Sequence, residues 1–299
     1  MIIRTEQDVT TAVLSELEGA ADPRFREVMS AFVRHLHAFA REVELSEAEF
    51  QAAIRTLVAI GRHTSDTHNE AVLMAGSLGF SQLICLINNN AGREAVETTA
   101  NLLGPFWRMH SPPTENGASI VRSPTPGPPL FVSARVVDEA GAAIAQAEVD
   151  VWQSSPEGLY EQQDETQAEM NLRGKLTTDG QGRFGFRSVL PAGYPIPIDG
   201  PVGELLAAQG RHNMRPAHLH FLIYKPGHKT LVSQVYVNGA PYLDSDVQFG
   251  VTEALVGDYV RHEPGEPAPA DDVEGEWYTL DKTFAMLPGE ARLPVPPIK

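Results

Sequence analysis

The sequence predicts an α+β protein in which a helical N-terminal region precedes an antiparallel β-sandwich. Over the first hundred or so residues, apolar side chains recur at intervals of three and four positions, as on one face of a helix. Beyond Pro112 they alternate, and turn residues recur every ten or so positions, as in antiparallel sheets. We therefore expect a helical region over residues 1–105 and a β-sandwich over residues 106–299.

Three long helices and one shorter helix are expected in the N-terminal region. The first begins at Asp22-Pro23, an N-capping aspartate followed by proline at the first helical position, and carries an apolar stripe from Phe25 to Phe39. The second begins at the capping box Ser46–Glu49. The third is expected to run unbroken from Glu70 to Ile87, and a shorter helix is expected just before Leu103.

The β region is expected to be built from short strands and hairpins. Two hairpins are indicated by turn residues, one around Asp179–Gly182 and one around Lys225–His228. The expected strands are Leu130–Val137, Glu148–Gln153, Leu176–Thr178, Arg183–Val189, His218–Tyr224, Thr230–Val237 and a late one within Trp277–Leu287. This number of short, regularly spaced strands is typical of a sandwich or barrel.

Composition excludes several classes of protein. The chain has 299 residues, of which 42% are hydrophobic, so it can bury a core without a disulfide or zinc staple. Its one cysteine, Cys85, rules out an internal disulfide and is typical of a cytoplasmic protein. A formal net charge of −16 repels nucleic acid. No signal peptide and no apolar run long enough to span a membrane is expected.

The tripeptide His218-Leu219-His220 is the sharpest local signal for chemistry. Residues i and i+2 of a strand point to the same face, so two imidazoles converge there. They are either metal ligands or two half-buried histidines bonded to backbone carbonyls, and the tripeptide alone does not separate these readings. In His35-Leu36-His37 the same spacing falls on a predicted helix, where the side chains diverge by about 200°, so chelation is not expected.

Other candidate residues are weaker when taken singly. Tyr160 and Tyr194 occupy loop-like settings near strand ends, where an amphipathic packing role is the usual one. His63 and His68 lie in a polar stretch between helices and are expected to be surface or capping residues. No Cys-rich site, His-Glu-Xaa-Xaa-His helix or EF-hand loop is present in the sequence.

Several segments in a fixed order change that assessment. They are Leu103-Gly104-Pro105-Phe106-Trp107, Val149-Asp150-Val151-Trp152-Gln153 leading to Gly158-Leu159-Tyr160, Leu190-Pro191 to Pro201, and Arg215-Pro216-Ala217-His218-Leu219-His220-Phe221. In these segments, and in its helical N-terminal region, the chain resembles the intradiol ring-cleaving aromatic dioxygenases. The similarity is to the branch that opens catechol, chlorocatechol and hydroxyquinol (1,2,4-trihydroxybenzene), and it covers nearly the whole chain.

The resemblance implies a mononuclear non-haem Fe(III) centre. Its ligands would be Tyr160, Tyr194, His218 and His220, with Tyr194 the tyrosinate that the substrate displaces and that takes up a diol proton. Phenolate is a hard anionic donor that suits Fe(III), and a trivalent ion can hold it deprotonated. Arg215 would stabilise negative charge on the ring, and Gln234 would be a polar neighbour of the site. Small aromatic diols and O2 would be the substrates.

The resemblance favours hydroxyquinol as substrate, with a (hydroxy)muconate or maleylacetate as product. Gly76 and Gln248 depart from the expected pattern: Gly76 replaces an acidic residue and should widen the pocket, and Gln248 replaces a small apolar one. Catechol or a substituted catechol is therefore the alternative substrate. The residues expected to border the ring are Leu73, Gly76, Leu103, Pro105, Phe106, Ile196, Pro197 and Gln248.

The helical region has a second implied role. In this branch it forms a homodimer contact, often around a tunnel that holds a phospholipid-like molecule, and the apolar stripe Phe25–Phe39 agrees with that, although packing within one chain explains it equally well. A reading from another class also stays open, namely a non-catalytic β-sandwich whose histidines bind zinc, another ligand or nothing. Colour separates the two, because tyrosinate bound to Fe(III) is wine-red.

Overall fold

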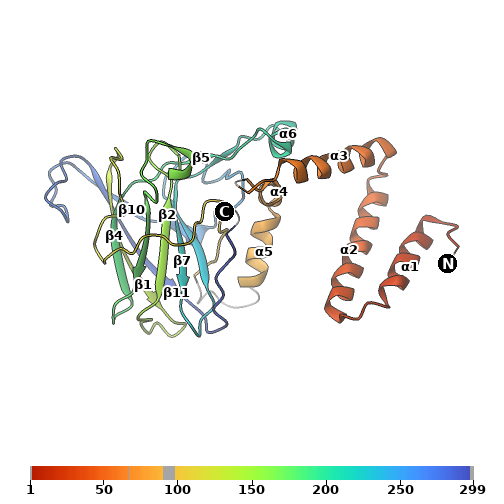
Figure 1. Cartoon of the computed structure of the whole chain (residues 1–299), viewed down its shortest axis with the longest axis horizontal. Helices are drawn as coiled ribbons and strands as arrows, with labels where there is room; N and C mark the ends of the chain where they lie inside the picture. Colours follow the sequence, from red (N-terminus) through yellow and green to blue (C-terminus); the bar gives the residue numbers. More distant parts are fainter. Residues whose placement is uncertain (1, 67, 90–97, 297–299) are drawn as a thin grey trace. The chain divides into compact units, whose positions relative to one another are not determined.

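The computed structural model describes residues 2–66, 68–89 and 98–296, and the chain divides into two compact units, Met1–Ala59 and Ile60–Lys299 (Figure 1). The helices are α1 (Glu6–Leu17), α2 (Pro23–Glu42), α3 (Glu47–His63), α4 (Glu70–Ser77), α5 (Phe80–Asn89) and α6 (Pro201–Ala208). The strands are β1 (Pro129–Val137), β2 (Glu148–Gln153), β3 (Arg173–Thr177), β4 (Arg183–Val189), β5 (Tyr194–Pro195), β6 (Met214–Arg215), β7 (His218–Tyr224), β8 (Leu231–Val237), β9 (Val256–Gly257), β10 (Tyr259–His262) and β11 (Trp277–Ala285). Two short 3₁₀ turns, Glu161–Gln163 and Glu253–Leu255, complete the set of elements.

The capping residues place two helix starts of the first unit as predicted. Asp22 accepts a hydrogen bond from the Arg24 amide at 2.8 Å at the start of α2, and Ser46 and Glu49 form the expected capping box at the start of α3. Helix α1 was not predicted. It begins with a box of the same kind, in which Thr5 and Asp8 cap each other's amides, so a Thr-Xaa-Xaa-Asp pattern was the signal that could have located it.

The predicted unbroken helix from Glu70 to Ile87 is wrong. It is two helices, α4 and α5, whose axes differ by 78°, and Gly79 lies between them with a left-handed φ of 71°. Glycine ends a helix in this conformation at little steric cost, and the apolar spacing continues across the break, so periodicity alone did not reveal it. The short helix predicted before Leu103 is absent from residues 98–102, and residues 90–97 lie outside the described residues.

The α4–α5 pair is also the feature most relevant to membrane spanning. Among the described residues no single helix is long and apolar enough to cross a bilayer, while this bent pair passes the same length and composition test when taken together.

The second unit contains two facing sheets (Figure 1). One has the strand order β10-β11-β1-β4, the other β3-β2-β7-β8-β9, and β5 and β6 form a separate two-stranded ribbon. Most neighbours are antiparallel, but β1 pairs with β11, and β8 with β9, in parallel, so the sheets are mixed. The alternation of apolar residues predicts a strand but not its direction, which is why the purely antiparallel expectation missed these two pairings.

One of the two predicted hairpins is confirmed. Strands β7 and β8 pair antiparallel across the Lys225–His228 turn. Strands β3 and β4 are joined by the expected tight turn at Asp179–Gly182 but enter different sheets, so they do not form the predicted hairpin. A short turn fixes the local chain reversal, whereas the choice of sheet partner depends on residues far away in the chain.

The sheet containing β2 and β7 is buried on both of its faces. Leu219, Phe221 and Ile223 of β7 belong to the large apolar core between the two sheets. Leu222 points the other way, into a smaller cluster with Trp152 and Tyr160. Because successive side chains of a strand alternate, the same strand supplies the core from one face and a second buried region from the other.

Candidate metal centre

His218 and His220 lie on that second face of β7. Their side chains are both 1% exposed, and their Nε2 atoms are 3.0 Å apart. The Nδ1 of His218 lies 2.7 Å from the backbone carbonyl of Pro216, which assigns the proton to Nδ1 and leaves the Nε2 lone pair facing His220. The two Nε2 atoms therefore meet at one point. The interpretation as two half-buried histidines predicts only the hydrogen bond to a backbone carbonyl and not this convergence.

Tyr160 and Tyr194 join the histidines from two loops. Their rings lie 5.3 Å apart, edge to face, and Tyr194 is 5.5 Å from the His218 ring. Gly158 has a φ of 78°, and a Cβ there would lie 2.7 Å from the Gly193 carbonyl oxygen. The absence of a side chain at position 158 thus lets the two tyrosine-bearing loops approach each other.

A buried ion pair anchors the Tyr160 loop. Nε of Arg173 donates to both carboxylate oxygens of the adjacent Glu161, each at 2.8 Å, and Nη1 of Arg173 donates to the carbonyl of Phe106 at 2.7 Å. The Phe106 ring in turn stacks on Tyr160, with centroids 4.2 Å apart. Arg173 and Glu161 were not singled out in the sequence, since neither carries a motif that marks a buried pair.

The electrostatics of the four side chains agree with a cation site. Burial, followed by the charge of Arg215, lowers the pKa of His218 to about 3, and burial lowers the pKa of His220 well below its usual value, so both imidazoles are uncharged near neutral pH. Burial and the neighbouring Tyr194 raise the pKa of Tyr160 well above its usual value. A bound multivalent cation would lower the pKa of Tyr160 again and would stabilise its deprotonated, phenolate form.

An orphaned polar atom gives a further test of fit. The Tyr160 hydroxyl is buried and has no hydrogen-bond partner in the part of the chain that the structure describes. Such a group costs about 1–3 kcal/mol when it is left unpaired. Together with the Tyr194 oxygen and the two imidazole nitrogens, this unpartnered oxygen makes a set of oxygen and nitrogen donors that suits iron.

Arg215 lies beside these four side chains at the centre of a buried network. Although burial opposes its charge, the Asp246 carboxylate, 3.1 Å from its Nε and from its Nη2, holds the pKa of Arg215 well above its usual value. Nη2 also donates to Gln234 and Tyr236, at 3.0 and 2.9 Å, and Nη1 lies 3.4 Å from the Tyr194 hydroxyl. The guanidinium is therefore fixed and charged next to Tyr194.

Two members of this network were missed in the sequence. Tyr236 is on the same face of β8 as Gln234, so strand alternation could have located it. Asp246 lies in the loop that follows β8, and no local pattern predicts that its carboxylate reaches Arg215.

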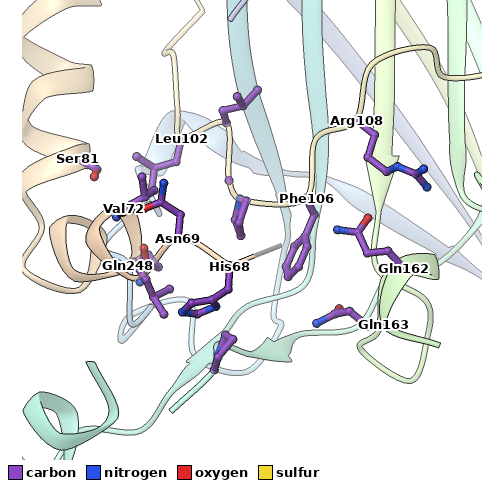
Figure 2. Close-up of a pocket in the computed structure, with 15 residues that line it drawn as sticks. His68, Asn69, Val72, Ser81, Leu102, Phe106, Arg108, Gln162, Gln163 and Gln248 are labelled. Atoms are coloured by element: carbon purple, nitrogen blue, oxygen red, sulfur yellow. Dashed lines mark hydrogen bonds between the residues drawn. The ribbon is translucent and has the colours of Figure 1, made fainter. Parts of the chain in front are cut away.

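A cavity of about 570 Å³ is lined by 15 residues, which Figure 2 draws, and Phe106 of its wall stacks on Tyr160. Six of the eight residues expected to border the ring line it, namely Leu73, Leu103, Pro105, Phe106, Pro197 and Gln248. Gly104 also lines it, and a Cβ at Gly104 would lie 3.2 Å from Cε1 of His220, so this wall is continuous with the histidines. Figure 2 shows Gln248 and Asn69 on one side of the cavity and Phe106 and Gln163 on the other, with His68 between them.

Gly76 and Ile196 lie outside the cavity wall, and the expected widening at Gly76 does not occur. The Gln248 amide fills the space beside Gly76, where an added Cβ would overlap its Oε1, and its Nε2 donates to Ser77 at 3.0 Å. Ile196 is buried in an apolar cluster with Val202 and Leu206.

The cavity wall also has a polar part that the sequence did not predict. His68, expected at the surface, lines the cavity and is hydrogen-bonded to Glu70. The further unpredicted lining residues are Asn69, Val72, Ser81, Leu102, Arg108, Gln162 and Gln163.

A β-sandwich that gathers two phenols and two imidazoles at one buried point, beside a cavity of small-molecule size, has the features of a metal-dependent enzyme. Comparison with known proteins agrees. The family model described as "Dioxygenase" matches residues 102–278, and that described as "Catechol dioxygenase N terminus" matches residues 22–96. The chain belongs to the intradiol ring-cleavage dioxygenase family, whose members use non-haem iron, act on aromatic diols with O2 and are dimeric.

Relatives match over nearly their full length. The chain is 40% identical to a hydroxyquinol 1,2-dioxygenase of Nocardioides simplex, over 95% of this chain and 96% of that protein. It is 40% identical to a 6-chlorohydroxyquinol 1,2-dioxygenase of Cupriavidus pinatubonensis, over 95% and 98%. The solved structure of a hydroxyquinol 1,2-dioxygenase from Pseudomonas putida DLL-E4 superimposes with a TM-score of 0.85 at 37% identity, covering 95% of this chain and 99% of that one.

Proposed function

We propose that the protein binds one Fe(III) ion through Tyr160, Tyr194, His218 and His220 and cleaves the ring of hydroxyquinol between two hydroxylated carbons with O2. The observation that carries this proposal is the 3.0 Å approach of the two Nε2 atoms beside the unpartnered Tyr160 hydroxyl. When bound, Fe(III) would supply Lewis acidity toward the diol oxygens and draw electron density from the ring, which prepares it for O2.

Tyr194 and Arg215 would handle protons and charge. Tyr194 would be the phenolate that takes up a diol proton, which is supported by the position of its ring between the His218 ring and Phe106 of the cavity wall, at 5.5 and 6.0 Å. The Arg215 guanidinium, 3.4 Å from the same hydroxyl, stabilises the negative charge of the ionised diol, and its bond to Asp246 keeps it in position. Gln234 holds Arg215 on one side and donates to the Leu102 carbonyl at 2.7 Å on the other, which ties the cavity wall to the network.

The wall would orient the ring and exclude water. Leu103, Pro105 and Phe106 supply apolar surface next to the proposed iron ligands, and Leu73 and Pro197 border the cavity as well. The polar part around His68, Asn69 and Gln248 can bind a third ring hydroxyl, which hydroxyquinol has and catechol lacks. The product would be a hydroxymuconate, or its maleylacetate tautomer.

Colour and substrate preference test the proposal. Iron-loaded protein is expected to be wine-red with one iron per chain, and the Tyr194→Phe variant is expected to lose both colour intensity and activity. A colourless wild type would favour the non-catalytic β-sandwich.

The relative kcat/KM values for hydroxyquinol, catechol and chlorocatechols identify the preferred substrate. A preference for catechol would replace hydroxyquinol in the proposal. Arg215→Ala should lower turnover by about 10²–10³-fold while iron content stays unchanged.

We also propose that helices of the first unit form a homodimer contact. Phe25, Phe32, Leu36 and Phe39 of α2 are each about half exposed in the single chain, and contiguous exposed apolar side chains often mark a protein–protein contact. Light scattering of wild type and of Phe32→Glu would test it, with a dimer expected for the first and a monomer for the second. Mass spectrometry of an organic extract would show whether a phospholipid is held there.

A further inference from the structure

A cluster of metal-binding side chains lies outside the four proposed iron ligands. His63 ends α3, and His68 and Glu70 follow across the loop into α4. One imidazole nitrogen from each histidine and one carboxylate oxygen of Glu70 all lie within 4.8 Å of one another. Of its three members, only His68 also lines the substrate cavity, and the reaction proposed above uses neither His63 nor Glu70.

Glu70 is the fixed member of the group. Its side chain is 1% exposed, its Oε1 accepts from the Val202 amide at the start of α6 at 2.8 Å, and its Oε2 lies 2.6 Å from Nε2 of His68. Among the described residues, His68 is its ion-pair partner and no lysine or arginine lies within 4.0 Å. A buried carboxylate that is oriented from behind by a backbone amide and lacks a permanent cation is typical of a metal ligand.

His63 approaches the same point from the other side. Its ring meets that of His68 edge to face at 5.1 Å, and its Nε2 is 3.6 Å from the exposed carboxylate of Asp199. A Cβ at Gly200 would lie 2.6 Å from Oε1 of Glu70 and 2.8 Å from Nε2 of His63. The absence of a side chain at Gly200 therefore lets the donor atoms of both residues approach the same stretch of backbone.

We propose that His63, His68 and Glu70 form a second metal site, which binds a divalent transition-metal ion such as Zn²⁺. Two imidazoles and one carboxylate are a common zinc ligand set, and Asp199 or water can complete a tetrahedron. Ligands about 2.0–2.1 Å from zinc lie roughly 3.3 Å from each other, so the cluster must contract. The His63 side chain, 32% exposed at a helix end, is free to make that adjustment.

Occupancy of this site would join three elements. The metal would link the end of α3 and the start of α4 to the loop before α6. The first turn of α6 already holds Glu70 through the Val202 amide. His68 also lines the cavity, so a bound ion would fix one side of its wall. The expected consequences are a higher Tm in the presence of zinc and, if the proposed reaction is correct, an altered KM for the diol.

Zinc titration of the iron-loaded full chain tests the proposal without relying on activity. We expect calorimetry with ZnCl₂ to give one zinc per chain and the iron content to stay constant. His63→Ala and His68→Ala should each weaken zinc binding at least tenfold and abolish the zinc-dependent rise in Tm. His35→Ala removes an exposed imidazole on α2 and should leave zinc binding unchanged. His63→Ala spares both hydrogen bonds of Glu70, so its fold should be preserved.

Three results would overturn the second site. One is the absence of saturable zinc binding to the wild type, which would mean that His68 and Glu70 only share a proton. Another is equal zinc affinity in wild type, His63→Ala and His68→Ala. The third is zinc uptake matched by loss of iron, which would place the zinc at the iron ligands. None of these outcomes contradicts the proposed dioxygenase activity, because the four proposed iron ligands and Arg215 lie outside the cluster.

Discussion

The two faces of the sheet β3-β2-β7-β8-β9 perform different tasks with the same strands. On one face Leu219 and Phe221 pack into an apolar core shared with the opposite sheet. On the other, His218 and His220 enter a buried polar centre that contains Arg215. Neighbouring residues of β7 therefore differ in kind. Core residues contribute free energy of folding, whereas the two histidines are desolvated imidazoles to which we assign a metal ion.

The sharpest test of this contrast is on the polar face. His220→Ala is expected to abolish iron binding and to lower kcat/KM by more than the roughly 10–100-fold that the loss of an outer partner of a metal ligand costs. The apo protein should still fold but with lower stability, because the buried His220 ring stacks on Trp152 with centroids 4.6 Å apart. Iron content and thermal unfolding of the same sample measure both effects; a variant that kept its iron would remove His220 from the ligand set.

The neighbouring residue on the apolar face should behave in the opposite way. Phe221 is 0% exposed and contacts Phe184, Phe186 and Phe284, so Phe221→Ala leaves a cavity that costs about 3–5 kcal/mol. Denaturant unfolding of the apo protein measures this. Iron content per folded molecule should stay near one. If Phe221→Ala lost iron while keeping its stability, the division between the two faces would be wrong.

The cavity wall offers a smaller effect that tests packing directly. Gly76→Ala should force the Gln248 amide out of its space beside α4 and into the cavity. Because overpacking of this kind costs roughly 1–3 kcal/mol, we expect kcat/KM to fall about tenfold. The double variant Gly76→Ala/Gln248→Ala should recover most of this loss, because the clash is then absent. Failure of the second substitution to restore activity would show that Gln248 does not cause the defect.

The smallest expected effect concerns a buried carboxylate on β2. Burial raises the pKa of Asp150 despite the nearby Lys175, so the folded chain binds this proton more tightly than the unfolded one. Stability must then fall as the pH rises from the model-compound value of 3.8 through the folded pKa. Asp150→Asn should accordingly raise Tm slightly near pH 7 and leave it unchanged below pH 3.8. A lower Tm at pH 7 would mean that the charged pair with Lys175 stabilises the fold.

Local patterns predicted the parts of this molecule that depend on neighbouring residues. The capping signals at Asp22 and Ser46 gave two helix starts, and alternation placed both histidines of β7 on one face. The two tyrosines were found only through resemblance, since an isolated Tyr160 in a loop has no pattern that predicts a partner. The Gly79 break was missed because a left-handed residue leaves the apolar spacing intact.

Contacts between distant residues lay beyond such patterns. The Asp246 carboxylate on Arg215, the ion pair of Glu161 with Arg173 and the filling of the space at Gly76 by Gln248 each join segments that are brought together only by the folded chain. For the same reason β3 and β4 entered different sheets despite the tight turn between them.

The amino-acid order alone therefore predicted the helical and β regions from periodicity and capping, which are local. Through the resemblance carried by its motifs it also gave the family and the side chains that we propose as metal ligands. The tertiary structure decided which of these side chains meet, which carboxylate fixes Arg215 and how the cavity is shaped, because burial and electrostatic pairing depend on distances in space that the spacing of residues along a chain does not specify.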